Sequence, residues 1–154
     1  MTDQDLGTRI VSLTATLYRV SCSLLHSEAD REDAVQAAIE KAWHKARSLR
    51  DESKLKPWLI RILINECYSI GRRHLREIPT DTIPESIAPE HGEDDDLREA
   101  LTKLSQIVRL PIVLHYMEGF TIAQIASMLR CPKGTVLSRM DRGRKQLKNL
   151  LLRE

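Results

Sequence analysis

The chain has 154 residues, of which 42% are hydrophobic and 30% are charged, a composition that suits one globular domain or two small ones. No apolar run approaches the roughly eighteen residues that a membrane-spanning helix needs, and the acidic start lacks the basic residues of a secretory signal. The three cysteines are an odd number, lie far apart and form no C-x-x-C pair. This pattern argues against a disulfide framework or a zinc site, so we expect a cytoplasmic protein without a metal or other cofactor.

The formal net charge of +2 hides a strong segregation along the chain. Residues 54–76 carry a net charge of +5 and residues 121–154 carry +6, whereas residues 77–96 carry −8. The two basic segments are candidate phosphate-binding surfaces, and the acidic segment between them would repel nucleic acid.

Hydrophobic residues follow helical spacing throughout the first half of the chain. The first predicted helix covers about residues 5–26. Asp30 is the expected N-cap of the second helix, whose buried face should include Trp43. The third helix has Pro57 in its first turn, where a missing N–H costs little, and ends in the basic residues 71–76.

The helical pattern stops at residues 78–95, a stretch that contains three prolines and a run of acids. Such a stretch cannot bury enough apolar area to offset the entropy lost on ordering it, so we expect a flexible acidic linker. The linker would join two small helical domains, residues 1–77 and residues 96–154. The expected fold class is therefore all-α.

The second domain has its own helix signals. Asp96 is the expected N-cap of its first helix, and a further helix spans about residues 107–118 with Gly119 at the C′ position. Thr121 should cap the next helix, and Pro132 should occupy the first position of the last one.

The segment from Thr121 to Leu147 is typical of a helix-turn-helix. A short apolar helix is followed by a break and then by a helix rich in Arg and Lys. This arrangement places one helix against the DNA backbone and the other in the major groove. No catalytic motif accompanies it, because the histidines are scattered and neither G-x-S-x-G nor a phosphate-binding glycine loop occurs. We do not expect an enzyme.

Three blocks of the sequence resemble bacterial sigma factors of the extracytoplasmic-function type, the small members that keep only the second and fourth conserved regions. In order along the chain, the blocks are Asp33–Trp43, Lys56–Asn65 with Arg72-Arg73, and Cys131–Arg139. They occur in the family's order and spacing over nearly the whole chain. The resemblance implies a transcription initiation factor, with region 2 in residues 1–77, which binds core RNA polymerase and the minus-ten element, and region 4 in residues 96–154, which recognises the minus-thirty-five element.

The resemblance also implies a polymerase-binding helix. In the family, the helix with the Asp-x-Val-Gln block docks on the clamp helices of the largest polymerase subunit. The polar side chains that would do so here are Asp33, Gln36, Glu40 and Lys41. From chemistry alone a solvated helix face is the simpler interpretation, and only the resemblance favours docking.

The third helix and the loop before it would meet the minus-ten element, where a base leaves the stack and enters a pocket. Asn65 offers both a donor and an acceptor to such a base, although it could equally bond locally. Arg61, Arg72 and Arg73 can neutralise phosphates. The few aromatic residues predict weak melting and hence stringent promoter choice.

The last helix would recognise the minus-thirty-five element. Its candidate DNA contacts fall near one face, with Lys145 continuing it, and they are Lys133, Thr135, Ser138, Arg139 and Arg142. Val136, Met140 and Leu147 should pack inward. Arg130 stands where the family usually has a turn glycine, so the turn needs either a left-handed arginine or a small shift.

Further partners follow from the resemblance: the polymerase flap, and an anti-sigma factor, often membrane-anchored, that covers the binding surfaces until a stress or envelope signal releases it. The acidic linker would enter a basic nucleic-acid channel of the polymerase, or else act only as a solubilising tether.

Two alternative functions for the whole chain remain. A stand-alone helix-turn-helix regulator would leave the Asp33–Trp43 block and the basic segment 54–76 unexplained. A helical protein-interaction adaptor would bind acidic partners without DNA sequence preference.

Overall fold

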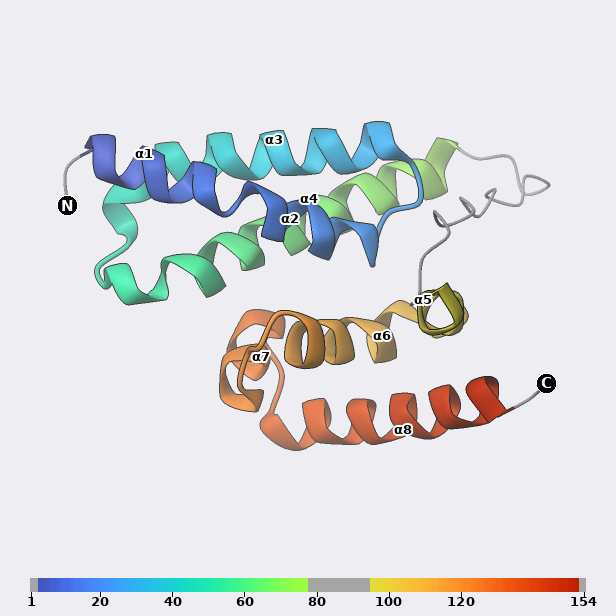
Figure 1. The fold of residues 1–154 in the computed structure, drawn as a ribbon. Helices are drawn as coiled ribbons and strands as arrows, with labels where there is room; N and C mark the ends of the chain where they lie inside the picture. Colours follow the sequence, from blue (N-terminus) through green and yellow to red (C-terminus); the bar gives the residue numbers. More distant parts are fainter. Residues whose placement is uncertain (1–2, 78–94, 153–154) are drawn as a thin grey trace. The chain divides into compact units, whose positions relative to one another are not determined.

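The computed structural model describes residues 3–77 and 95–152, and the chain divides into two compact units between residues 86 and 87. Within the described residues all regular structure is helical, which confirms the expected all-α class (Figure 1). The acidic linker predicted for residues 78–95 lies outside the described residues except for Asp95. The predicted domain limits stay predictions.

The described residues of the first unit form four α-helices and two short 3₁₀ turns: α1 (Asp3–Ser12), α2 (Thr14–Cys22), α3 (Glu28–His44), η1 (Ala46–Ser48), η2 (Glu52–Lys54) and α4 (Leu55–Glu77). The long helices α3 and α4 pack along each other (Figure 1). Ala34, Ala38 and Ala42 recur every four residues on α3 and are fully buried, so they form a buried row of small side chains along the helix. Large apolar residues of α4, Leu59, Ile60, Leu63 and Ile64, fill the core against it.

The single first helix predicted for residues 5–26 is wrong, because α1 and α2 are separate helices with Leu13 between them. The Ser12 hydroxyl donates to the Arg9 carbonyl at 2.6 Å, and the Leu13 N–H donates to the Ile10 carbonyl three residues back. Such short-range bonds compete with the regular i→i−4 pattern and tighten the turn. Apolar residues are buried on both sides of the break, at Ile10, Leu17, Val20 and Leu24, whereas Leu13 at the break itself is only half-buried.

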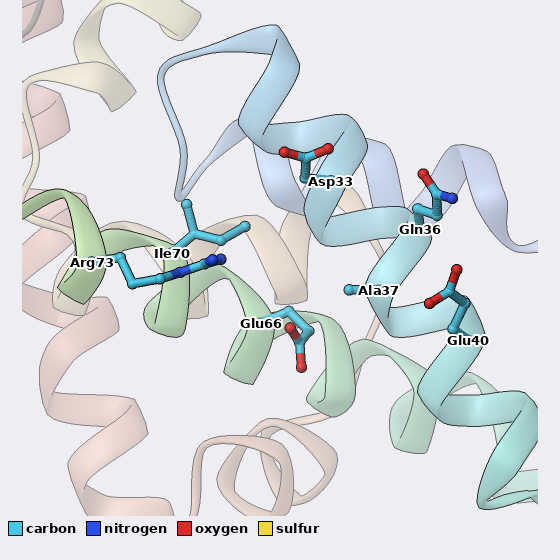
Figure 2. Close-up of a pocket in the computed structure, with 7 residues that line it drawn as sticks. All are labelled: Asp33, Gln36, Ala37, Glu40, Glu66, Ile70 and Arg73. Atoms are coloured by element: carbon cyan, nitrogen blue, oxygen red, sulfur yellow. The ribbon is translucent and has the colours of Figure 1, made fainter.

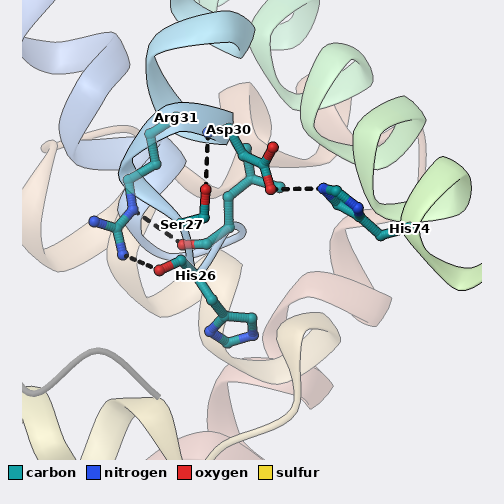
Figure 3. Close-up of polar contacts among 6 residues, drawn as sticks. His26, Ser27, Asp30, Arg31 and His74 are labelled. Atoms are coloured by element: carbon teal, nitrogen blue, oxygen red, sulfur yellow. Dashed lines mark hydrogen bonds and ion pairs between the residues drawn. The ribbon is translucent and has the colours of Figure 1, made fainter. Parts of the chain in front are cut away.

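Ser27, and not Asp30, is the N-cap of α3. Ser27 has extended backbone, and its hydroxyl accepts a hydrogen bond from the Asp30 N–H at 3.1 Å, as an N-cap side chain does (Figure 3). The Asp30 carboxylate instead lies 2.7 Å from His74 Nε2 of α4. Arg31 closes the turn before α3 by donating to the carbonyls of Leu25 and His26. These bonds fix the N-terminal end of α3 beside the basic end of α4.

The prediction that Trp43 is buried in the core is wrong. Its side chain is 48% exposed. It lies one residue beyond Ala42, where the α3 stripe has turned away from the core. Its ring covers Gly7 of α1, whose added Cβ would lie 3.5 Å from the indole. The indole therefore shields α1 while one side remains in water.

The second unit contains α5 (Asp95–Thr102), α6 (Gln106–Ile112), the π-helical turn η3 (Val113–Met117), α7 (Ile122–Leu129) and α8 (Lys133–Leu152). Helix α5 begins at Asp95, so the prediction of Asp96 as its N-cap is wrong. Arg109, which is 7% exposed, donates to the carbonyls of Leu101, Thr102 and Leu104. Its guanidinium thus satisfies carbonyls at the end of α5, and burial lowers the pKa of the guanidinium.

The helix predicted for residues 107–118 is present but not regular. Pro111 lies inside α6, and the chain continues as η3, where the Glu118 N–H donates to the carbonyl of Val113 five residues back. A proline without an N–H leaves one carbonyl of α6 without its helical donor, and a wider turn accommodates the disturbance. Gly119 then takes a positive φ of 76°, which confirms it as the terminating residue.

The helix-turn-helix consists of α7 and α8. Thr121 caps α7 as predicted, in a capping box with Gln124. Arg130 ends α7 in the left-handed conformation (φ 54°, ψ 47°), so the turn keeps its shape without glycine. Pro132 is not the first residue of α8 but directly precedes it, and its carbonyl accepts the first helical hydrogen bond, from Val136. The exposed face of α8 is thereby set by a defined turn.

Candidate functional site

The exposed face of α4 carries three of the four residues predicted to contact the minus-ten region. Arg61, Asn65 and Arg72 are four and seven residues apart, so they lie on one face of the helix. Asn65 is exposed, and its side chain makes no hydrogen bond to another described residue. The local bonding that was the alternative for Asn65 is therefore not seen. The amide remains available to a ligand.

Tyr68 belongs to the same face of α4 and was not predicted. It lies three residues after Asn65 and seven after Arg61, and it is 37% exposed. An aromatic ring beside an amide is suited to stacking on an unpaired base. The spacing from Asn65 was the signal in the sequence that could have identified it.

Arg73 does not share that face. It lies seven residues after Glu66 and three after Ile70, and with them it lines a surface pocket of about 310 Å³ between α3 and α4 (Figure 2). Helix α3 contributes the other lining residues, Asp33, Gln36, Ala37 and Glu40. The structure thus brings Arg73, a predicted DNA contact, together with three of the four predicted polymerase contacts.

Lys41, the fourth predicted polymerase contact, does not line the pocket. Its ammonium forms an ion pair with Glu66 of α4. The Glu66 side chain is 11% exposed and that of Lys41 is 54% exposed, so the carboxylate depends on this cation for compensation more than the reverse. The role of Lys41 as a polymerase contact stays a prediction, and its positive charge is already partly compensated by Glu66.

The outer face of α8 carries the predicted minus-thirty-five contacts. Thr135, Ser138, Arg139, Arg142 and Lys145 recur at intervals of three, four or seven residues and therefore lie on one side of the helix. Ser138, Arg142 and Lys145 are exposed, whereas Thr135 and Arg139 are half-buried. Lys145 forms an ion pair with Asp141 at 3.1 Å, one turn earlier.

Lys133 does not lie on this side of α8, although the sequence placed it there. It is the first residue of the helix, two positions before Thr135, and residues two apart do not face each other. A cation at a helix N-terminus is also poorly placed for the helix dipole. Its contact with DNA stays a prediction that depends on its place at the helix start.

The opposite side of α8 packs on the rest of the unit. Val136 and Met140 are buried as predicted, whereas Leu147 is only half-buried. Gly143 is also buried, and a Cβ on it would lie 2.2 Å from Ile112 Cδ1 of α6. The lack of a Cβ at Gly143 allows α8 to pack close to α6. Near it, Arg144 donates to the Tyr116 hydroxyl at 3.0 Å, a polar link that the sequence did not predict.

Among residues 3–77 and 95–152, no helix has the length and apolar character to cross a membrane. The same residues contain no group of three or more His, Cys, Asp or Glu side chains placed to hold a metal ion.

Comparison with known proteins agrees with this arrangement. Residues 10–77 match the family model "Sigma-70 region 2", and residues 94–147 match "Sigma-70, region 4". The chain is 32% identical over 141 residues to the ECF RNA polymerase sigma factor SigM of Mycobacterium tuberculosis, covering 88% of this chain and 71% of that protein. It is 28% identical over 153 residues to the RNA polymerase sigma factor SigV of Bacillus subtilis, covering 97% and 92% respectively.

Solved structures give the same result. The sigma factor RpoE of Bartonella quintana, solved in complex with the anti-sigma factor NepR, superposes with a TM-score of 0.82 at 31% identity, covering 98% of this chain and 99% of that one. CnrH, solved in complex with the cytosolic domain of CnrY, superposes with a TM-score of 0.70 at 23% identity, covering 97% and 89%, and supports the fold alone. The chain belongs to the sigma-70 family of transcription initiation factors, among the sigma factors of the extracytoplasmic-function type.

Proposed function

We propose that this sigma factor binds core RNA polymerase mainly through α3, which docks on the clamp helices of the largest subunit, while the second unit contacts the flap. The observation that carries the proposal is that Asp33, Gln36 and Glu40 are exposed at helical spacing and have no side-chain partner among the described residues. Unpaired charged and amide groups suit hydrogen bonds and ion pairs across an interface. A solvated face would look the same in isolation, and the family membership favours docking.

The exposed face of α4 would engage the minus-ten element. Asn65 would hydrogen-bond the edge of a flipped base, and Tyr68 would stack on an unpaired base beside it. Arg61 and Arg72, on the same face, would neutralise the neighbouring phosphates. Chemically distinct tasks thus fall on one face of one helix.

The outer face of α8 would lie in the major groove at the minus-thirty-five element. Ser138 and Arg139 would reach base edges, and Arg142 and Lys145 would contact the backbone. The defined turn at Arg130 fixes the angle at which α8 leaves α7. A stand-alone regulator would use only the second unit, and a protein-interaction adaptor would not bind DNA through α8. Family membership favours the sigma factor over both alternatives.

An anti-sigma factor is the further partner that the relatives suggest. The Bartonella quintana sigma factor, similar over almost the whole chain, was solved in complex with one. A protein of this kind would cover the polymerase-binding or DNA-binding faces until a signal releases it. Membrane anchoring of that partner remains a proposal from the resemblance.

Promoter binding and promoter melting can be measured separately to test the two DNA roles. Core polymerase is loaded with wild type, Asn65→Ala or Arg139→Ala and bound to a promoter fragment; filter retention reports binding, and permanganate reactivity of thymines reports melting. We expect Arg139→Ala to weaken binding about tenfold, the effect of losing one good base contact. Asn65→Ala should abolish thymine reactivity while binding changes by about threefold or less, because the pocket acts only on an opened strand.

The control is Arg98→Ala, which removes an exposed arginine from α5, outside both proposed faces. It should behave as wild type in both measurements. If Asn65→Ala and Arg139→Ala changed binding and melting equally, the division of roles between α4 and α8 would be wrong. If neither had an effect, the DNA faces would lie elsewhere on the molecule.

A further inference from the structure

Arg72 and Arg73 are adjacent in the sequence but belong to different surfaces. Arg72 lies seven residues after Asn65 and continues the proposed DNA face of α4. Arg73 lies seven residues after Glu66 and projects over the pocket between α3 and α4 (Figure 2). The arginine pair that the sequence assigned to DNA is therefore divided by the helical repeat.

The pocket carries charges of both signs that are not used within the protein. Arg73 is the only cation among its lining residues, and Asp33 and Glu40 line the same pocket from α3. None of these three side chains forms an ion pair or hydrogen bond with another described residue. Glu66, the third carboxylate of the lining, differs, because Lys41 already compensates its charge.

These charges disfavour a DNA phosphate as the occupant. A phosphate brought to Arg73 would also approach Asp33 and Glu40, and both carboxylates would repel it without compensation. A protein helix can present a carboxylate and a basic side chain one turn apart, so it can satisfy both signs together. The lining therefore complements a protein surface of mixed charge.

We propose that Arg73 is part of the polymerase-binding surface and not of the DNA-binding surface. In this arrangement the polymerase helix that docks on α3 places a carboxylate on the Arg73 guanidinium and a basic side chain between Asp33 and Glu40. The inference rests on the proposed docking of α3, and it adds a residue of α4 and the charge pattern required of the partner. Arg73 is exposed, so its removal changes the interface without disturbing the core.

The test compares Arg73→Ala with its neighbour Arg72→Ala. Affinity for purified bacterial core RNA polymerase is measured by fluorescence anisotropy of the labelled full chain, and promoter binding is then measured at saturating core. Arg73→Ala should weaken core binding about tenfold, as loss of one partner in an interfacial charge pair does, and leave promoter binding at saturation unchanged. Arg72→Ala should show the opposite pattern. Arg73→Lys should fall between wild type and Arg73→Ala, since it keeps the charge but loses the planar fork.

Asp33→Ala separates the failure of this inference from the failure of the proposed docking. If Asp33→Ala weakens core binding and Arg73→Ala does not, the docking of α3 stands and the role of Arg73 is overturned. If neither weakens it, the docking of α3 falls and the inference with it. Equal losses of core affinity in Arg72→Ala and Arg73→Ala would indicate a general effect of positive charge and would also overturn the proposal. Unchanged thermal unfolding of Arg73→Ala confirms that the variant is folded.

Discussion

The ion pair between Lys41 on α3 and Glu66 on α4 joins the two longest helices of the first unit. Removing the ammonium leaves a nearly buried carboxylate without its cation, and a lone buried charge is costly. Because Lys41 is half exposed, water compensates part of that loss, and we expect Lys41→Met to lower the free energy of unfolding by about 1 kcal/mol.

The free energy of unfolding of the first unit can be measured by urea unfolding followed by tryptophan fluorescence. The signal reports on this unit because it contains both tryptophans of the chain, Trp43 and Trp58. The double variant Lys41→Met, Glu66→Gln should recover most of the loss, since no net charge then remains in the contact. An unchanged midpoint for Lys41→Met alone would mean that the ion pair contributes nothing.

Gly143 sets the distance between α8 and α6. A Cβ at this position would lie 2.2 Å from Ile112 Cδ1 and 2.7 Å from Val108 Cγ1. Gly143→Ala should therefore destabilise the second unit by about 1–3 kcal/mol, despite the better helix propensity of alanine, which is worth about 1 kcal/mol. Hydrogen exchange of the α8 amides provides the measurement. Gly134→Ala is the matched control, with nothing within 4 Å of its added Cβ, and it should slow exchange. Slower exchange in both variants would show that α6 and α8 are not in tight contact.

Arg130 adopts a left-handed conformation that costs energy for any residue with a Cβ. Arg130→Gly should relieve this strain and raise the free energy of unfolding of the second unit by about 0.5–1 kcal/mol after the entropy of glycine in the unfolded chain is deducted. The midpoint of thermal unfolding, followed by the NMR signals of α7 and α8, tests the change. A lower midpoint would mean that the arginine side chain contributes more than the strain costs.

Cys67 is buried in α4, and burial, with the neighbouring Glu66 charge adding to it, raises the pKa of its thiol from 9.0 to about 12. Alkylation requires the thiolate, so iodoacetamide at pH 8.5 should modify Cys22 and Cys131 but not Cys67 in the native chain. In the double variant Cys22→Ala, Cys131→Ala, mass spectrometry should detect no adduct until denaturant is added. Rapid native labelling of that variant would contradict the burial of Cys67.

The raised pKa of the Cys67 thiol also makes the free energy of unfolding depend on pH. The folded-state pKa of Cys67 lies above its unfolded value, so the protein favours the neutral thiol. The stability that depends on this neutral thiol is fully present below about pH 9 and is lost as pH rises toward 12. Replacing Cys67 with alanine should remove this alkaline loss.

The all-α class and the helix-turn-helix could be predicted because they depend on local signals. Thr121 with Gln124 forms a capping box, and Gly119 takes the positive φ that helix ends favour. Asp30 was misassigned because its residue type suits an N-cap, whereas Ser27 has the required extended backbone and Asp30 has a tertiary partner in His74. Sequence propensity contains no information about that partner.

The candidate sites were likewise predicted without knowledge of tertiary packing. The adjacent pair Arg72-Arg73 was assigned to DNA as one basic cluster, and Lys133 was placed with Thr135 on one face of the last helix. Assignment to a face depends on where each helix begins and on what packs beside it. The ion pair of Lys41 with Glu66 could not be foreseen either, since 25 positions separate them and only the packing of α3 on α4 brings them together.

Run-off transcription tests the central claim most directly. Purified bacterial core RNA polymerase transcribes a genomic promoter library with and without this protein, and transcript starts are mapped. We expect discrete starts that require the protein and become much weaker in the Asp33→Ala and Arg139→Ala variants, each tested alone. The absence of protein-dependent starts, together with tight sequence-specific DNA binding by the protein without polymerase, would contradict the sigma-factor account and support a stand-alone regulator.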